Sequence, residues 1–233
     1  MLYYQTVSLN LITILKRLMS FSEVSKFRLV GGTSLALQVG HRKSEDIDFF
    51  CEKKFDNKHL QFFLQKSFKN FVIDWQNMEG FVARIDDVKV DFFTWHTPFI
   101  YPQIEIDNIR MADKREIAAM KMEAITSRKE KRDFIDLAVL LREYELKELL
   151  SAFRIRYPFI SHKFVMESLT AIDYADESIN PEMIIDYKWE DVKKDIQKNI
   201  EEYFLSQLAN AEKIKQERLN KAEELLKKRN KKQ

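Results

Sequence analysis

The chain has 233 residues, of which 45% are hydrophobic and 12% aromatic, so it is long and apolar enough to bury a core and is not a disordered polymer. Its net charge of +2 does not indicate a nucleic-acid partner, and its single cysteine, Cys51, excludes an intramolecular disulfide or a cysteine-built zinc site. The single cysteine indicates a reducing, cytoplasmic setting, and because no apolar stretch approaches the roughly 18 residues that span a bilayer, we expect no membrane partner.

Apolar periodicity predicts an N-terminal part in which helices and strands alternate. The predicted helices cover residues 7–24, 33–39 and 57–69, and the predicted strands cover 27–30, 47–50, 71–76, 80–86 and 88–95. The pair Asp86-Asp87 predicts a tight hairpin turn between the last two strands.

Strand signals nearly vanish after about residue 113. The predicted helices there cover residues 113–128, 132–144, 145–155, 161–172 and 188–229. We therefore expect an α+β fold in two domains. Residues 1–108 form a mixed sheet flanked by helices, and residues 109–233 form a helical bundle that ends in a long charged helix.

The last 23 residues, 211–233, carry nine Lys or Arg against four Glu, a net charge of +5. One interpretation is a solvated helix end that frays. The other is an electrostatic arm that contacts RNA or a partner protein.

Three of the four glycines lie between positions 31 and 40, and Gly31-Gly32 stands between a predicted strand and a predicted helix. Such a turn aims free backbone N–H groups and the positive end of the helix dipole at an anion, and a triphosphate is a suitable anion. An ordinary strand-to-helix turn has the same local sequence, so this pair alone is weak evidence.

Two acidic side chains follow on the next predicted strand. Alternation places Asp46 and Asp48 on one face, and because neighbouring carboxylates repel, they favour a hard cation such as Mg²⁺ between them. Asp91 lies on a later alternating strand and would complete the site if the two strands are adjacent. An Asp-x-Asp pair by itself is also compatible with a polar strand edge.

Gly-Gly, thirteen residues, Asp46-Ile-Asp48 and a third Asp on a later strand together resemble the DNA polymerase β-type nucleotidyltransferase superfamily. A closer resemblance is to its AbiEii/AbiGii toxin-type branch, in the sequences of residues 31–50, Lys114–Ile125 and Lys131–Leu137. The resemblance covers about residues 27–142.

This resemblance implies an enzyme that moves a nucleoside monophosphate from an NTP to an acceptor hydroxyl. It implies two Mg²⁺ ions, with Mn²⁺ as a substitute, held by Asp46, Asp48 and Asp91. The acceptor would be an RNA such as a tRNA 3′ end, and an antitoxin protein would be a partner. Lys121 would bind phosphates, and Asp133 or Asp136 would orient the substrate or the catalytic centre.

Local patterns leave alternatives open for several of these residues. Lys121 lies in an apolar helix stripe, where it needs an anion or a route to water. Asp133 could be a helix N-cap, and Asp136 could pair with Arg132 one turn away. The nucleotide-binding candidates are Gly31, Gly32, Thr33, Arg42, Ser44, Lys121 and Arg128, although Arg42 could lie on the surface and Ser44 in a loop.

Two other classes of function fit the same residues. One is a catalytically silent protein that binds nucleotides or partners with this fold, and the other is a kinase-like phosphoryl transferase. The four histidines show no metal-ligand spacing and are interpreted as structural or surface residues.

Overall fold

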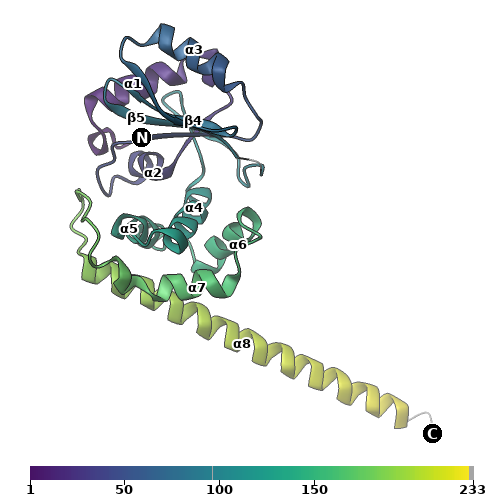
Figure 1. Ribbon diagram of the computed structural model, residues 1–233. Helices are drawn as coiled ribbons and strands as arrows, with labels where there is room; N and C mark the ends of the chain where they lie inside the picture. The colour runs from purple at the N-terminus through teal and green to yellow at the C-terminus, as the bar shows by residue number, and fades with distance from the viewer. Residues whose placement is uncertain (96, 231–233) are drawn as a thin grey trace.

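The computed structural model describes residues 1–95 and 97–230, with side chains up to residue 221. A mixed sheet forms one lobe, a group of helices forms the other, and a long helix leaves the second lobe (Figure 1). The described residues form a seven-stranded sheet in the order β3-β4-β5-β2-β1-β7-β6. Its strands are β1 (Arg28–Val30), β2 (Ile47–Cys51), β3 (Phe71–Gln76), β4 (Gly80–Ile85), β5 (Val88–Thr94), β6 (Ile104–Ile106) and β7 (Ile109–Met111).

The central pairing of the sheet joins strands that are far apart in the sequence. Strand β2 runs parallel to β5 and antiparallel to β1, while β1 runs parallel to β7. The pairs β3–β4, β4–β5 and β6–β7 are antiparallel hairpins. Asp86 and Asp87, with φ of 46° and 67°, form the tight β4–β5 turn that the sequence predicts.

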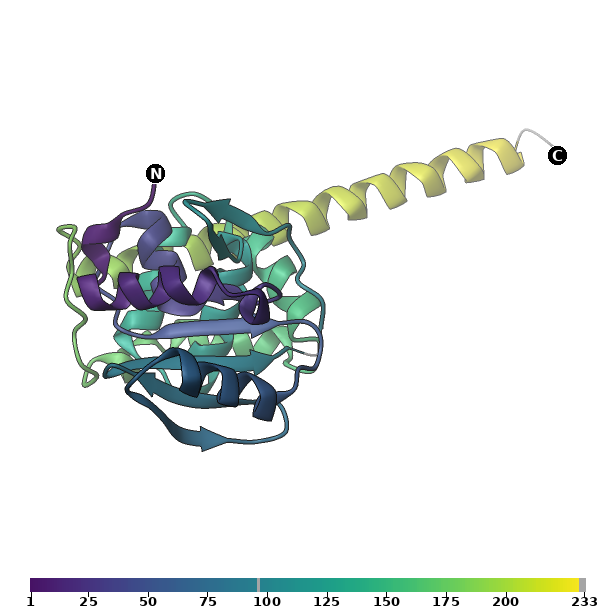
Figure 2. The ribbon, with the colours of Figure 1, turned by 90° about the horizontal axis from the view of Figure 1, so that it is seen from above.

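One face of the sheet is buried beneath α1 (Leu9–Met19) and α3 (Asn57–Ser67), which lie across it in the view from above (Figure 2). Alternate strand residues point to this face. Among them Phe49, Phe81 and Phe92 are fully buried and pack ring against ring. This core holds β2, β4 and β5 in fixed register, so the residues between the buried ones must point to the opposite face.

The opposite face looks toward the helical lobe. Helix α2 (Gly31–Val39) follows β1 directly and ends at Gly40, whose φ is 82°. The second lobe contains α4 (Lys114–Ser127), α5 (Lys131–Leu140), α6 (Leu146–Arg156), α7 (His162–Thr170) and the beginning of α8 (Trp189–Asn230). Its apolar core extends to Val30 and Leu35 of the sheet lobe, so the two lobes share buried contacts.

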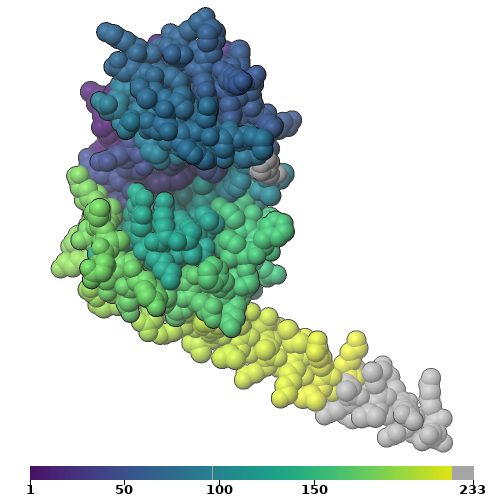
Figure 3. Space-filling view, in the orientation of Figure 1, coloured from purple at the N-terminus to yellow at the C-terminus, as the bar shows by residue number. Residues whose placement is uncertain are grey.

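Beyond about residue 200, helix α8 projects away from both lobes (Figure 3). Between residues 201 and 221 nearly every residue is exposed, including Phe204, Leu205 and Leu208. The basic segment lies in this projection as far as residue 230, while its side chains from residue 222 onward and the whole of 231–233 fall outside the described residues. No described helix is both long enough and apolar enough to cross a bilayer.

The α+β architecture predicted from the sequence is confirmed, with differences in several element bounds; the helix expected over 132–144, for example, ends at Leu140. The helix expected over 7–24 ends at Met19, and a short 3-10 turn, η2 (Ser22–Val24), follows it. Helix α2 starts at Gly31 rather than at Thr33. The β6–β7 hairpin was not predicted, and through it the sheet continues to Met111. These strands have three residues each, too few for an apolar alternation to be recognised.

Candidate active site

Asp48 and Asp91 are direct neighbours on the sheet face that looks toward the helical lobe. The parallel β2–β5 register pairs Asp48 with Asp91, and the β1–β2 register pairs Val30 with Asp48. Paired residues in adjacent strands point to the same face. The predicted adjacency of the two acidic strands is therefore present, with Asp46 one residue before the start of β2.

The site electrostatics disfavour two negative charges on this pair. Burial raises the pKa of Asp48 to about 6, and Asp91 and Asp46 add to the rise through repulsion. Burial also raises the pKa of Asp91, although the neighbouring Lys89 opposes the shift. A cation placed at these carboxylates would reverse both effects, because it would favour their charged forms.

Within the described chain, the only cation paired with these acids is Lys89, whose ammonium lies 3.1 Å from Oδ2 of Asp91. The other oxygen of Asp91, Oδ1, is buried and has no hydrogen-bond partner. No three His, Cys, Asp or Glu side chains among the described residues form a complete metal-binding group. Mg²⁺ is commonly held by one or two carboxylates together with substrate phosphates and water, so the Asp48–Asp91 pair fits that ion.

The Gly31-Gly32 turn lies directly against the acids. Gly31 has a φ of 66°, and a Cβ at this position would come within 2.2 Å of Oδ2 of Asp48. A Cβ on Gly32 would come within 2.6 Å of Nη2 of Arg42. A side chain at either glycine would therefore have to displace the Asp48 carboxylate or the Arg42 guanidinium, and the N-terminus of α2 stands between these two groups.

Thr33 and Ser44 fix the segment that leads into the acidic strand. The Thr33 hydroxyl contacts the Ser44 hydroxyl at 2.8 Å and donates to the backbone carbonyl of Asp46. Thr33 is fully buried, whereas Ser44 is partly exposed. These contacts support a positioning role for Thr33. Whether either residue binds a nucleotide stays a prediction.

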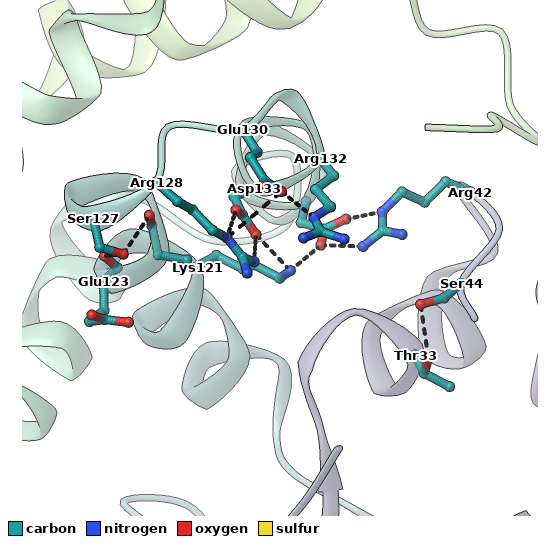
Figure 4. A network of polar contacts seen from close by, with 12 residues as sticks. Thr33, Arg42, Ser44, Lys121, Glu123, Ser127, Arg128, Glu130, Arg132 and Asp133 are labelled. Atoms are coloured by element: carbon teal, nitrogen blue, oxygen red, sulfur yellow. Dashed lines mark hydrogen bonds and ion pairs between the residues drawn. The ribbon is translucent and has the colours of Figure 1, made fainter. Parts of the chain in front are cut away.

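A second group of carboxylates lies in the helical lobe and is surrounded by cations (Figure 4). Asp136 accepts two hydrogen bonds from Arg42, at 2.6 and 2.7 Å, and contacts His41 Nε2 at 2.7 Å. The Lys121 ammonium lies 2.7 Å from Asp136 and 3.0 Å from Asp133. Burial alone would raise the pKa of Asp136, but Arg42 and Lys121 hold it well below its ordinary value.

Asp133 completes this network from the same helix. It accepts hydrogen bonds of 2.7 and 2.9 Å from Arg128, and both Lys121 and Arg128 keep its pKa low despite its burial. We name Asp133, Asp136, Arg42, Lys121 and Arg128 the ion cluster.

The structure decides between the local alternatives that the sequence left open. Asp133 is not a helix N-cap, because α5 begins after Glu130. Asp136 does not pair with Arg132, which contacts Glu130 at 2.6 Å instead. Lys121 does not extend to water, because it is 5% exposed and held by two carboxylates. For Asp136, the partners from other elements, Arg42 and Lys121, replace the local partner Arg132.

Arg42 is likewise not a surface residue, since only 4% of it is exposed. The backbone around it is braced by the segment that joins α7 to α8: Lys43 N–H donates to the carbonyl of Glu182, and Ile184 N–H donates to that of His41. The connection rises beside α2 in Figure 1. These hydrogen bonds fix the backbone of the segment between α2 and β2, which contains Arg42.

The ion cluster and the acidic pair are within electrostatic reach of each other. Lys121 lowers the pKa of Asp48, and Asp48 in turn contributes to the raised pKa of Arg128. All the predicted site residues thus gather around the seam between the lobes. Sequence reasoning missed His41 as a partner of Asp136 and Lys89 as a partner of Asp91. The signal for Lys89 was its shared strand face with Asp91.

Paired acids on a mixed sheet, a glycine-opened helix beside them and nearby buried cations are the features that the sequence predicts for a nucleotidyltransferase site. A family model described as the nucleotidyl transferase AbiEii toxin of type IV toxin–antitoxin systems matches residues 13–227. The chain belongs to this family and is a nucleotidyltransferase.

Individual proteins are also similar to this chain. The chain is 32% identical over 197 residues to protein aq_aa25 of Aquifex aeolicus (strain VF5), a match that covers 81% of this chain and 93% of the relative. A candidate nucleotidyltransferase from H. pylori has a similar fold, with a TM-score of 0.55, 18% identity and coverage of 83% of this chain and 94% of its own. JHP933 from Helicobacter pylori gives a TM-score of 0.51, with 19% identity and coverage of 88% and 98%. At these identities the two structures support the fold alone.

Proposed function

We propose that the chain transfers a nucleoside monophosphate from an NTP to a hydroxyl of an RNA, such as a tRNA 3′ end. In this proposal the reaction depends on Mg²⁺, with Mn²⁺ as a substitute, and the protein acts as the toxin of a toxin–antitoxin pair, with an antitoxin as its partner. The supporting observation is the Asp48–Asp91 pair, which has one unpartnered carboxylate oxygen and lies beside the Gly31-Gly32 turn.

Asp46, Asp48 and Asp91 are the proposed metal ligands. Bound Mg²⁺ would neutralise phosphate charge and stabilise the attacking and leaving oxygens of an in-line displacement. The Oδ1 atom of Asp91 is free to accept the proton of the acceptor hydroxyl. The hydroxyl oxygen of the acceptor forms a bond to the α-phosphorus, the bond between the α-phosphorus and the oxygen that bridges it to the β-phosphorus breaks, and pyrophosphate leaves.

The ion cluster has a supporting role in this proposal. Asp133 and Asp136 hold Lys121, Arg42 and Arg128, of which Arg42 lies against Gly32 at the N-terminus of α2, and the positive charge of the three would stabilise the triphosphate. The two aspartates are then positioning residues that act through the cations they hold. Gly31 and Gly32 allow the phosphates to approach the backbone N–H groups of the helix.

The direct test incubates the full chain with each labelled NTP, Mg²⁺ and total RNA, and then identifies the labelled species. We expect nucleotide incorporation into RNA and release of pyrophosphate, with a loss of at least about 100-fold in Asp48→Ala. Asp173→Ala is a matched control, because Asp173 is an exposed carboxylate of the helical lobe that pairs with Lys193.

The products distinguish the remaining classes of function. A nucleotide adduct on the acceptor supports nucleotidyl transfer, whereas a bare phosphate identified by mass spectrometry would indicate kinase-like transfer. Binding of NTP without release of pyrophosphate would indicate a catalytically silent protein. Equal incorporation by wild type and Asp48→Ala would overturn the proposed site.

A further inference from the structure

The sheet face that carries the acids continues outward past Asp91 onto β4 and β3. The registers pair Asp91 with Val82, and Val82 with Trp75. Trp75, Val82, Asp91 and Asp48 therefore form one row across four strands, with all four side chains on the same face. Trp75 stands at the outer end of the row, on the edge strand of the sheet.

A β-bulge is what places Trp75 on this face. The β3–β4 register shifts between Ile73 and Trp75, so that two residues of β3 oppose one of β4. Without the extra residue, Trp75 would follow Ile73 onto the face that α1 and α3 cover. The bulge instead turns a large aromatic side chain toward the acidic pair, and Asp74, the inserted residue, pairs with Arg84.

Trp75 is 52% exposed, although it is the kind of side chain that folding usually buries. Its ring lies 6.1 Å from that of Phe93, which is on β5 two residues after Asp91. Phe93 has a structural task, because its ring covers Gly80 on the neighbouring strand. Phe93 can cover Gly80 without Trp75. Packing therefore does not explain why the Trp75 side chain is exposed on this face.

Cations accompany the aromatic side chains on the same face. Arg84 and Lys89 are paired across β4 and β5, two residues from Val82 and Asp91, with side chains that are 55% and 44% exposed. Exposed aromatic rings for stacking and cations for phosphates are the combination that binds single-stranded nucleic acid.

We propose that Trp75, next to Phe93, is a base-stacking site for the single-stranded end of the acceptor nucleic acid, with Arg84 and Lys89 contacting its phosphates. This inference rests on the proposed transfer to RNA and assigns where the acceptor strand lies. Neighbouring strands are about 4.8 Å apart, so Trp75 is about 10 Å from Asp91. About three stacked nucleotides, at roughly 3.4 Å each, span that distance. The terminal hydroxyl would then reach Asp91 while a base a few nucleotides upstream stacks on Trp75.

The test measures binding of an eight-nucleotide single-stranded RNA to the full chain, without NTP or Mg²⁺. Trp75→Ala should weaken binding by roughly 5- to 100-fold, because a base loses its stacking partner, while Trp75→Phe keeps most of the affinity. Phe62→Ala is the matched control. Phe62 is 57% exposed on α3, across the sheet, and its removal should change affinity by less than about twofold.

Binding without NTP remains measurable if no nucleotide is transferred, so failure of the proposed reaction and failure of this inference are distinguishable. Where transfer occurs, Trp75→Ala should raise the KM for RNA and leave the KM for NTP unchanged. The inference is overturned if Trp75→Ala binds the oligonucleotide as wild type does. It is also overturned if wild type does not bind the single strand, or binds a blunt duplex equally well.

Discussion

Two groups of aspartates lie on either side of the seam between the lobes, and they differ in the source of the positive charge that compensates their carboxylates. In the ion cluster, Asp133 and Asp136 are surrounded by cations of the protein itself, and their pKa values are lowered. At the sheet, burial raises the pKa values of Asp48 and Asp91, and Lys89 contacts only one of the two. The first group is internally compensated, and the second needs a cation from outside.

Burial of an aspartate therefore does not by itself indicate its role. A compensated carboxylate holds other groups in place, because its oxygens are already occupied by hydrogen bonds. An uncompensated buried carboxylate is unfavourable in its charged form, and a bound cation would stabilise that form. Measurements of stability, pH dependence and metal response should therefore move in opposite directions for the two groups.

The largest expected effect is on stability in Asp136→Asn. The change removes a buried negative charge that Arg42, Lys121 and His41 all contact, and we expect a loss of about 3–5 kcal/mol in the free energy of unfolding. Asp48→Asn should instead stabilise the metal-free protein by about 1–2 kcal/mol at pH 7, because it removes a disfavoured charge. Urea unfolding of both variants checks the pair, and a destabilised Asp48→Asn would contradict the distinction.

The pH dependence of stability should also separate the groups. Because the pKa of Asp136 is lowered on folding, its contribution is present above the unfolded pKa near 4 and is lost as the pH falls further. Because the pKa of Asp48 is raised to about 6, its contribution is largest below about pH 4 and is lost as the pH rises toward 6.

Mg²⁺ should change the pH dependence that we expect from Asp48. Mg²⁺ requires the charged carboxylates, so the ion should stabilise the protein more at pH 7.5 than at pH 5. Thermal unfolding with and without Mg²⁺, in wild type and in Asp48→Asn, measures the difference. An equal Mg²⁺ response at both pH values, or an unchanged response in the variant, would show that Asp48 does not hold the ion.

The smallest difference is expected between two glycines that both have a positive φ. Gly31→Ala and Gly40→Ala both place a side chain at positive φ, and each should cost about 1–3 kcal/mol of stability. Only Gly31 lies against Asp48, whereas a Cβ on Gly40 would meet the ring of Tyr3. Gly31→Ala should therefore lower nucleotide transfer at least about tenfold beyond Gly40→Ala when the folded fraction is matched. Equal activity in the two variants would argue against a role for Gly31 at the acids.

The sequence by itself determined the features that depend on neighbours along the chain. Alternation placed Asp48 and Asp91 opposite buried phenylalanines, paired aspartates marked the β4–β5 hairpin, and Gly40 ended α2, because side-chain direction and turn geometry are local properties. The spacing from Gly-Gly to Asp-x-Asp, read as a family resemblance, indicated the nucleotidyltransferase class that the family match confirms.

Only the tertiary structure decided which distant groups meet. It brought β2 beside β5, although α3, β3 and β4 lie between them in sequence, and it gave Asp136 a partner 94 residues away in Arg42 rather than the nearby Arg132. It also turned Trp75 toward the acids through a one-residue bulge. The physical reason is that strand order, bulges and buried ion pairs are set by competition among all the elements that pack together, and no local pattern records the outcome of that competition.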